Sequence, residues 1–302
     1  MRAVFALNPW ESKRLIGRAV ARLPEVRYAL EHTQMIIAHG STNVFVAEEV
    51  LGYCPERDKY VSGHVINGTM CQTESAEKPP ILRLVKGQPV PPVPTMEETL
   101  AGWDDTCVFI KGANAVDPEF NAAVFNAHAS AGTIGFAYGK ICGMGIPLIV
   151  PIGLEKLIPS VKEASNQLGH ARVDYFNGQR IGMLPLINAK VITEIQAFDI
   201  LYGLPAVHVG GGGVSGAEGT VVLSVNGKDM AVKKAIAEFE SIKGEPALGL
   251  QKALCETCRP STPALRAADG SQVIEETPTT CIYSGTLEAD LPDWFQKRQA
   301  VS

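Results

Sequence analysis

The sequence predicts an α/β fold with a Rossmann-like parallel sheet, covered by helices on both faces, and a ferredoxin-like α+β subdomain after it. Two observations carry this prediction. From residue 35 to about residue 168, short apolar runs alternate with segments of helical periodicity, which is typical of parallel sheets. From residue 181 to 243 the order becomes β-α-β-β-α, which is typical of ferredoxin-like units.

The 302 residues divide into three predicted parts. Residues 1–175 form the Rossmann-like domain, residues 176–250 the ferredoxin-like subdomain, and residues 251–302 an irregular tail with little periodicity. In the first part, Pro24 either breaks the helix before it or occupies the first turn of the next helix, and Thr95 with Glu98 makes a capping box. The helices expected there cover residues 12–23, 25–32, 44–51, 95–100 and 132–144, with one more after Pro159.

Strands are expected where short apolar or β-branched runs stand between turn residues. Six prolines interrupt residues 75–95, so this segment is predicted to be extended or looped. The strands expected in the first part are residues 35–39, 60–67, 106–110 and 147–151. In the second part, strands at 181–187, 206–209 and 220–226 alternate with helices at 191–202 and 230–242.

Composition excludes several classes of protein. A hydrophobic content of 46% is too high for a disordered chain, and 27 basic against 32 acidic residues argue against nucleic-acid binding. No uncharged apolar run reaches the ~18–20 residues that cross a bilayer, so no membrane association is expected. Seven cysteines, an odd number, favour reduced thiols in a cytoplasmic protein. A homo-oligomer is expected as the default for such proteins, and no cofactor is expected.

The segment Gly40-Ser41-Thr42-Asn43 follows a predicted buried strand and precedes a predicted helix. Backbone N–H groups, two hydroxyls and the positive end of the helix dipole meet the needs of a phosphate or carboxylate. The alternative is a simple helix cap made by Ser41 or Thr42.

A second polar segment follows the strand at 106–110 and contains Gly112, Asn114 and Asp117. Open α/β sheets bind their ligands at the carboxyl ends of strands, which makes these residues candidates for ligand contact or proton transfer. The alternative is an Asx-type turn built by Asn114 or Asp117.

These segments, together with Gly139-Lys140 and Pro147-Leu148-Ile149-Val150, resemble the ribose-5-phosphate isomerase superfamily, which includes glucosamine-phosphate deaminases and coenzyme A transferases. Residues 132–147 are also similar to methylthioribose-phosphate isomerases and translation initiation factor 2B subunits. The resemblance implies this fold over roughly residues 12–245, with a sugar-phosphate loop at Gly40, Ser41 and Thr42.

The chain departs from the superfamily at its proton-transfer motif. Asn114 and Ala115 stand where the isomerases have acidic residues, whereas Gly112, Ala113, Val116 and Asp117 match. An amide has no carboxylate that titrates near neutral pH, so it cannot act as a general base. Ordinary ribose-5-phosphate isomerase activity is therefore not expected.

Six of the 29 glycines lie in residues 210–219. They either permit positive φ in a wide hairpin or let backbone N–H groups, such as those of Gly211 and Gly212, approach a ligand. His208 and Glu218 flank the run, and either is a candidate acid, base or ligand. A strand rather than a helix follows, so the run is not a dinucleotide fingerprint.

Cys255-Glu256-Thr257-Cys258 is half of a zinc site. The second pair is missing, with only Cys281 downstream and Cys54 or Cys71 far upstream. A chance spacing or a weak redox pair is the favoured interpretation, which leaves Cys255 and Cys258 as weak metal candidates and no metal site predicted.

The sequence thus predicts a protein that binds a small anionic metabolite, a sugar phosphate or a carboxylate or acyl-coenzyme A-like compound. The proposed ligand-binding residues are Gly40, Ser41, Thr42, Asn43, Gly112, Asn114, Gly211 and Gly212. For an isomerase- or transferase-type reaction, the catalytic candidates are Asp117, Glu218 and His208. The alternatives are a ligand sensor or assembly protein that has lost the chemistry, and a metal or redox protein centred on Cys255 and Cys258.

Overall fold

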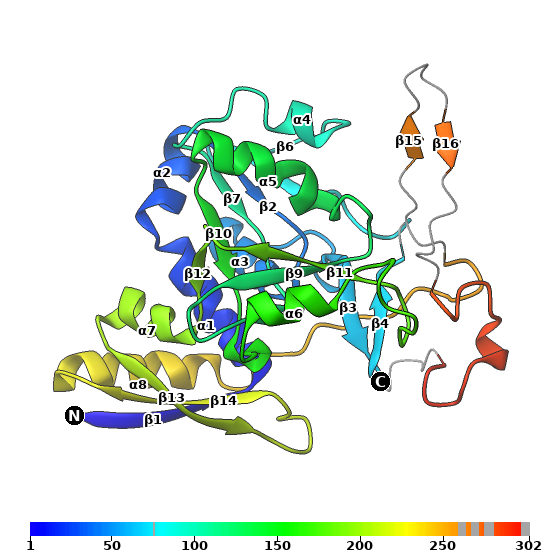
Figure 1. The fold of residues 1–302 in the computed structure, drawn as a ribbon. Helices are drawn as coiled ribbons and strands as arrows, with labels where there is room; N and C mark the ends of the chain where they lie inside the picture. The colour runs from blue at the N-terminus through cyan, green and yellow to red at the C-terminus, as the bar shows by residue number, and fades with distance from the viewer. Residues whose placement is uncertain (75, 259–263, 267–271, 275–280, 297–302) are drawn as a thin grey trace.

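The computed structural model describes residues 1–74, 76–258, 264–266, 272–274 and 281–296. Its centre is a six-stranded sheet with the order β12-β10-β7-β2-β5-β6 (Figure 1). Its strands are β2 (Gln34–Ile37), β5 (Leu82–Val85), β6 (Gln88–Val90), β7 (Val108–Ile110), β10 (Leu148–Pro151) and β12 (Lys190–Ile192). The strands β2, β7, β10 and β12 run parallel, whereas β5 and β6 are antiparallel to their neighbours. The α/β class is confirmed, with a mixed sheet.

The antiparallel strands β5 and β6 lie in the proline-rich segment that was expected to be extended or looped. Lys86 and Gly87, with φ of 47° and 72°, make the tight turn between them. Pro89 is tolerated because β6 is the edge strand and needs no donor on its outer side.

The helices follow the predicted pattern closely. Pro24 occupies the first turn of α2, both hydrogen bonds of the Thr95 capping box form, and α5 has the predicted bounds. The helices are α1 (Pro9–Ala21), α2 (Pro24–His32), α3 (Ser41–Leu51), α4 (Met96–Thr99), α5 (Gly132–Met144), α6 (Val161–Gln167), α7 (Glu194–Tyr202) and α8 (Asp229–Ile242). Short 3₁₀ turns are η1 (Arg57–Lys59), η2 (Leu154–Lys156) and η3 (Glu288–Asp290).

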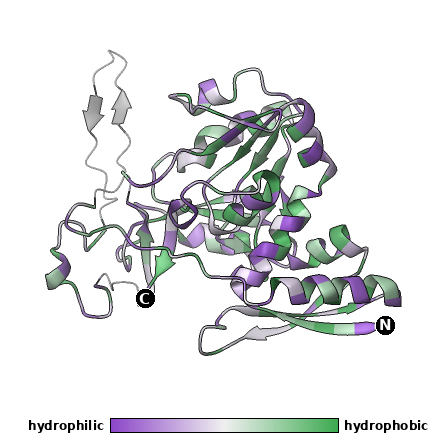
Figure 2. Ribbon diagram, turned by 180° about the vertical axis from the view of Figure 1, so that it is seen from behind, coloured by the Kyte–Doolittle hydropathy of each residue, from purple (hydrophilic) through white to green (hydrophobic). Residues whose placement is uncertain are grey.

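Two buried clusters cover the two faces of the central sheet, because adjacent strand residues point to opposite sides. Ile110 belongs to the cluster that contains α1, α3 and α7, whereas Phe109 belongs to the cluster that contains α5. Figure 2 shows the strands of this sheet as hydrophobic ribbons inside the molecule.

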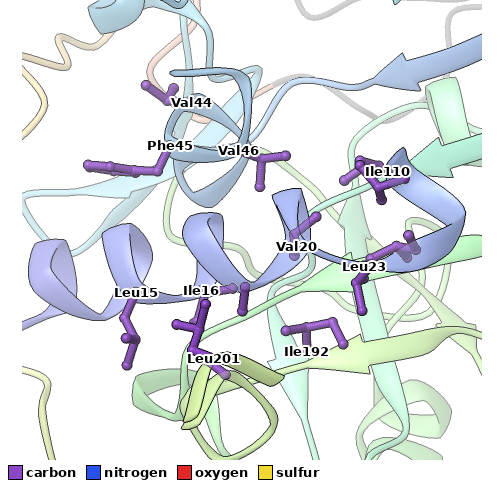
Figure 3. Packing of buried hydrophobic residues seen from close by; sticks show 14 of the residues in the cluster. Leu15, Ile16, Val20, Leu23, Val44, Phe45, Val46, Ile110, Ile192 and Leu201 are labelled. Atoms are coloured by element: carbon purple, nitrogen blue, oxygen red, sulfur yellow. The ribbon is translucent and has the colours of Figure 1, made fainter. Parts of the chain in front are cut away.

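Helix α1 lies between α3 and α7, with Leu15 and Ile16 directed toward Leu201 of α7 (Figure 3). On its other side, a Cβ added to Gly17 would come within 2.9 Å of the Phe45 carbonyl carbon. Gly17 therefore allows α1 and α3 to pack at short range. This contact fixes the position of α3, and therefore of its N-terminus, relative to α1.

A separate three-stranded antiparallel sheet has the order β1-β14-β13, with β1 (Arg2–Leu7), β13 (Ala206–Gly212) and β14 (Thr220–Asn226). Helix α8 packs on it, with the Phe5 and Phe239 rings 5.0 Å apart. The sequence predicted no strand at β1, because its partner β14 lies more than 200 residues away and leaves no local signal.

The strand expected at 181–187 is β11 (Gly182–Leu186), but it does not join that sheet. It pairs instead with β9 (Ala122–Asn126), which also pairs with β8 (Ala115–Val116). The order of strands along the chain does not determine which strands pair. The third strand of the sheet with β13 and β14 is therefore β1, where the predicted ferredoxin-like unit would have used β11.

The remaining strands form two hairpins, β3 (Gly63–Ile66) with β4 (Thr69–Gln72) and β15 (Ala264–Arg266) with β16 (Gln272–Ile274). A turn at Asn67 and Gly68, with φ of 48° and 70°, ends the strand expected at 60–67 and starts β4. None of the described helices combines the length and apolar character that a bilayer crossing requires.

Candidate functional site

The strands β2, β7 and β10 end at the same edge of the central sheet because they run parallel. A cleft of about 590 Å³ lies at this edge, a size typical of small-molecule sites. Its walls come from the segments that follow β2 and β7, from the β3–β4 hairpin, from β9 and from the start of α5.

The structure brings two of the predicted segments together in this cleft. Gly40, Ser41 and Thr42 line it from one side, and Gly112 and Asn114 line it from the other. The two loops touch, since a Cβ added to Gly40 would lie 3.7 Å from the Cα of Gly112.

Asn43 and Asn114 fix the backbone around the cleft. Asn43 is fully buried, and its Nδ2 donates to the carbonyl of Ala38 at 2.7 Å. Its Oδ1 is buried without a partner among the described residues. The Oδ1 of Asn114 accepts from the N–H of Phe125 at 3.0 Å, which ties the loop after β7 to β9.

Two helices begin at the cleft without a side-chain cap. The N-cap of α3 is Gly40, and that of α5 is Ala131, which has φ of 57°. Thr42 of α3 and Thr133 of α5 both line the cleft. The first N–H groups of a helix have no intrahelical partner and carry a partial positive charge, so both helix ends favour an anion.

Four lysines line the cleft, and none of the described lining residues is an aspartate or glutamate. They come from four segments of the chain: Lys13, Lys78, Lys111 and Lys156. The whole protein carries a formal charge of −5, so this concentration of positive charge runs against its average. The sequence interpretation missed these lysines, because they share no motif and the fold alone brings them together.

Lys111 and Lys156 both hold the loop after β7. The Nζ of Lys111 donates to the carbonyl of Gly112 at 3.0 Å, and the Nζ of Lys156 donates to the carbonyl of Ala113 at 3.1 Å. Burial, together with repulsion from Lys156, lowers the pKa of Lys111 to about 8. Burial also lowers the pKa of Lys156. These ammonium groups lack sufficient compensating charge, which a bound anion would supply.

Two carboxylates, those of Glu155 and Glu194, lie close to the lysines Lys13 and Lys156. The Nζ of Lys13 lies 2.9 Å from Oε1 of Glu155, a residue whose pKa is lowered, against the effect of burial, by Lys13 and Lys156. Glu194 is fully buried, and its Oε2 accepts from the N–H of Leu154 at 2.9 Å. Burial and the neighbouring Glu155 raise the pKa of Glu194 to about 7. Glu155 therefore carries the negative charge, and Glu194 holds its proton to a higher pH than an ordinary glutamate.

Three histidines complete the lining: His39, His64 and His128. Burial lowers the pKa of both His39 and His64 to about 4, so both rings are neutral at pH 7. Nε2 of His39 is bonded to the carbonyl of Pro79 at 2.7 Å, whereas both ring nitrogens of His64 lack a partner among the described residues. A buried imidazole with two open nitrogens is suited to contact a ligand. In the sequence, His64 is a lone histidine in a strand and gives no signal.

Asp117 lies outside the cleft lining. Its carboxylate accepts backbone N–H groups of Glu119, Asn121 and Val161 at 3.0–3.1 Å. These hydrogen bonds lower its pKa although burial opposes them. The residue therefore builds the turn after β8, which is the Asx-type alternative.

The glycine run belongs to the β13–β14 hairpin and does not reach the cleft. Gly211 pairs with Val221, and Gly212 pairs with Thr220. A Cβ on Gly211 would lie 2.9 Å from the Thr220 carbonyl oxygen, and Gly213 has φ of 117°, so the run serves the turn.

His208 and Glu218, the two candidates beside that run, are also absent from the cleft lining. His208 pairs with Leu223 in the sheet, and Oε2 of Glu218 accepts from the N–H of Gly216 at 2.9 Å.

Cys255 and Cys258 line a second, smaller cavity that shares one wall with the cleft.

No protein-family model matches this chain, and no curated protein matches it.

Proposed function

We propose that the protein binds a small organic anion carrying a phosphate or carboxylate group, in the cleft at the carboxyl ends of β2, β7 and β10. The observation that carries this proposal is the lining of four lysines without an acidic side chain among the described residues. The uncapped starts of α3 and α5 favour the same charge. A volume of about 590 Å³ suits a metabolite of sugar-phosphate size.

We also propose that the fold consists of a Rossmann-like unit and a ferredoxin-like unit, as in the ribose-5-phosphate isomerase superfamily. A Rossmann-like unit is supported by parallel β2, β7 and β10 with α3 after β2 and α5 before β10. A ferredoxin-like unit, in a form that uses β1, is supported by the β1-β14-β13 sheet with α8. Gly40, Ser41 and Thr42 stand where the ribose-5-phosphate isomerase superfamily would hold a sugar phosphate, and they line the cleft.

Proton transfer within the cleft is a second candidate function, favoured by His64. Asn114 stands where a carboxylate could act, and none of the described lining residues is acidic. The acid–base group would therefore be an imidazole or an amine. His64 is neutral at pH 7 and its ring nitrogens are open, and Lys111 has a pKa of about 8. Turnover assays with the anions that bind, comparing wild type with His64→Gln, separate an enzyme from a sensor.

Ligand binding is measured by thermal shift of the full chain. The panel contains sugar phosphates, acyl-coenzyme A compounds and small carboxylates, each paired with its neutral analogue. At a concentration of about 100 Kd, binding stabilises the folded state by about 2.7 kcal/mol and raises the melting temperature. Anions are expected to shift the melting temperature and their neutral analogues are not. Equal shifts from both members of each pair, or none from any anion, would contradict the proposal.

Ser41→Asp is expected to weaken anion binding by at least about tenfold, because it places a carboxylate at the start of α3 within the cleft. The measurement is calorimetric titration of the tightest anion from the panel. Ser160→Asp is the matched control: Ser160 caps α6, outside the cleft lining, and aspartate caps equally well. An unchanged affinity in Ser41→Asp would show that the anion binds elsewhere.

Anion affinity is expected to fall as the pH rises above 8. The pKa of Lys111 is about 8 in the free protein, and a bound anion raises it, so binding above pH 8 takes up a proton. The decrease approaches tenfold per pH unit until the pKa of the complex is reached. Titrations at pH 7, 8, 9 and 10 in two buffers of different ionisation enthalpy measure both the affinity and the proton uptake. Binding that is independent of pH over this range would exclude Lys111 as a contact.

A further inference from the structure

The small cavity beside the cleft is surrounded by four of the seven cysteines. Cys71 comes from β4, Cys255 and Cys258 come from the turn at residues 254–258, and Cys281 starts the last described segment. No disulfide joins these four described cysteines, so a disulfide does not account for their meeting. The sequence provided only the Cys255–Cys258 pair, and the fold supplies the second pair that a tetrathiolate site needs.

We propose that Cys71, Cys255, Cys258 and Cys281 form a metal site that holds a single zinc ion. Four thiolates are the usual ligand set for tetrahedral Zn²⁺ or an iron–sulfur cluster. The cavity of about 20 Å³ has room for one water-sized atom, which favours a single ion over a multi-iron cluster.

Polar groups already point at three of the four sulfurs. The N–H of Tyr283 donates to Cys281 Sγ at 3.4 Å, and Gln72 Nε2 lies 3.6 Å from Cys258 Sγ. Lys252 Nζ is 3.7 Å from Cys255 Sγ and is itself paired with Glu288 at 2.7 Å. Such donors stabilise thiolates, and a zinc tetrathiolate carries a net charge of −2 that needs them.

Binding closes the cavity and releases protons. Among the described residues no three cysteine, histidine, aspartate or glutamate side chains stand at coordinating positions, so the thiols turn inward to reach the Zn–S distance of about 2.3 Å. Burial raises the pKa of each of these thiols, that of Cys71 to about 12, so they are protonated in the metal-free protein. Four S–H bonds are replaced by four S–Zn bonds, and four protons pass to solvent.

The ion would anchor the C-terminal segment to the wall of the cleft. The buried cluster formed by the described residues of that segment consists of Cys255, Leu291 and Phe295, which is a small core. Backbone bonds from Ala253 to Gln72 and from Gly285 to Cys255 place the segment beside β4. Because Cys71 and Gln72 line both cavities, the site also supports one side of the cleft.

The test is the metal content of the full chain, purified under reducing conditions and measured by mass spectrometry. About one zinc per chain is expected, falling below about 0.2 in Cys71→Ser and in Cys255→Ser. The matched control is Cys142→Ser, an exposed thiol on α5, which keeps its zinc. Chelation of the wild-type protein is expected to expose residues 251–258 and 281–296 to protease while residues 1–74 and 76–250 stay folded.

Three results would overturn the proposal. One is wild-type protein that takes up no zinc even after reconstitution with Zn²⁺ under reducing conditions. Another is iron with acid-labile sulfide, which would identify a cluster instead of a single ion. The third is a full zinc content in Cys71→Ser, which would remove β4 from the site. Because two of these readouts use the wild-type chain, they remain decisive even when a serine variant fails to fold.

Discussion

Lys111→Glu is expected to weaken binding of the tightest anion by at least about 100-fold, because removing one partner of a buried charge pair costs about 2–5 kcal/mol and a new negative charge adds repulsion. The Nζ of Lys111 donates to the carbonyl of Gly112 in the loop after β7. Burial and repulsion from Lys156 lower its pKa to about 8, so a bound anion would stabilise its charged form. Calorimetric titration measures the affinity. Lys111→Met, which removes the charge without reversing it, is expected to fall between wild type and Lys111→Glu.

The matched control is Lys233→Glu, which makes the same change in net charge on the exposed side of α8, away from the cleft. Screening by salt leaves little interaction over that distance, so its affinity is expected to stay within about twofold of wild type. Equal losses in Lys111→Glu and Lys233→Glu would mean that net charge, and not this cleft, governs binding. An unfolded Lys111→Glu is recognised by its melting temperature, and Lys111→Met then decides.

Glu194→Gln is expected to stabilise the protein at alkaline pH by roughly 3 kcal/mol, and by little at pH 5. The folded-state pKa of Glu194 is about 7, above the ordinary value of 4.5, because of burial and of Glu155. A group with a raised pKa contributes its stability below pH 4.5 and loses it as pH rises through 7. Glutamine keeps an oxygen for the N–H of Leu154 and has no proton to lose.

Denaturant unfolding of wild type and Glu194→Gln at pH 5, 7 and 9 measures this difference. Glu240→Gln, on the exposed side of α8, is the matched control and is expected to show no pH-dependent gain. A variant that is less stable than wild type at pH 9 would show that Glu194 is ionised and paired in the folded protein, contrary to the charge arrangement beneath Lys13 and Lys156.

Local signals in the sequence predict most of the helices of this fold. Prolines and caps act within one turn, which is why Pro24, Thr95 and the helix at 132–144 were found from the sequence. Strand pairing is not local. The partner of β1 is β14, and the partner of β11 is β9. The residue pattern within 2–7 or 182–186 does not identify these partners, because the pairing is decided by how the whole chain packs.

The candidate site divides in the same way. Gly40, Ser41, Gly112 and Asn114 could be predicted because parallel strands bring their carboxyl ends to one edge of the sheet. The lysines and His64 could not, since each lies in a different segment and only the cleft unites them. Asp117 was chosen for its place after the strand at 106–110 and Glu218 for its place beside the glycine run, but both carboxylates are bonded to neighbouring backbone N–H groups outside the cleft.

A crystal structure of the full chain with the tightest anion from the panel tests the central claim most directly. The expected result is density for the phosphate or carboxylate at the N-termini of α3 and α5, in contact with Ser41 or Thr42 and with Lys111 or Lys156. An anion bound at any other place, with this cleft containing only solvent, would contradict the proposed function.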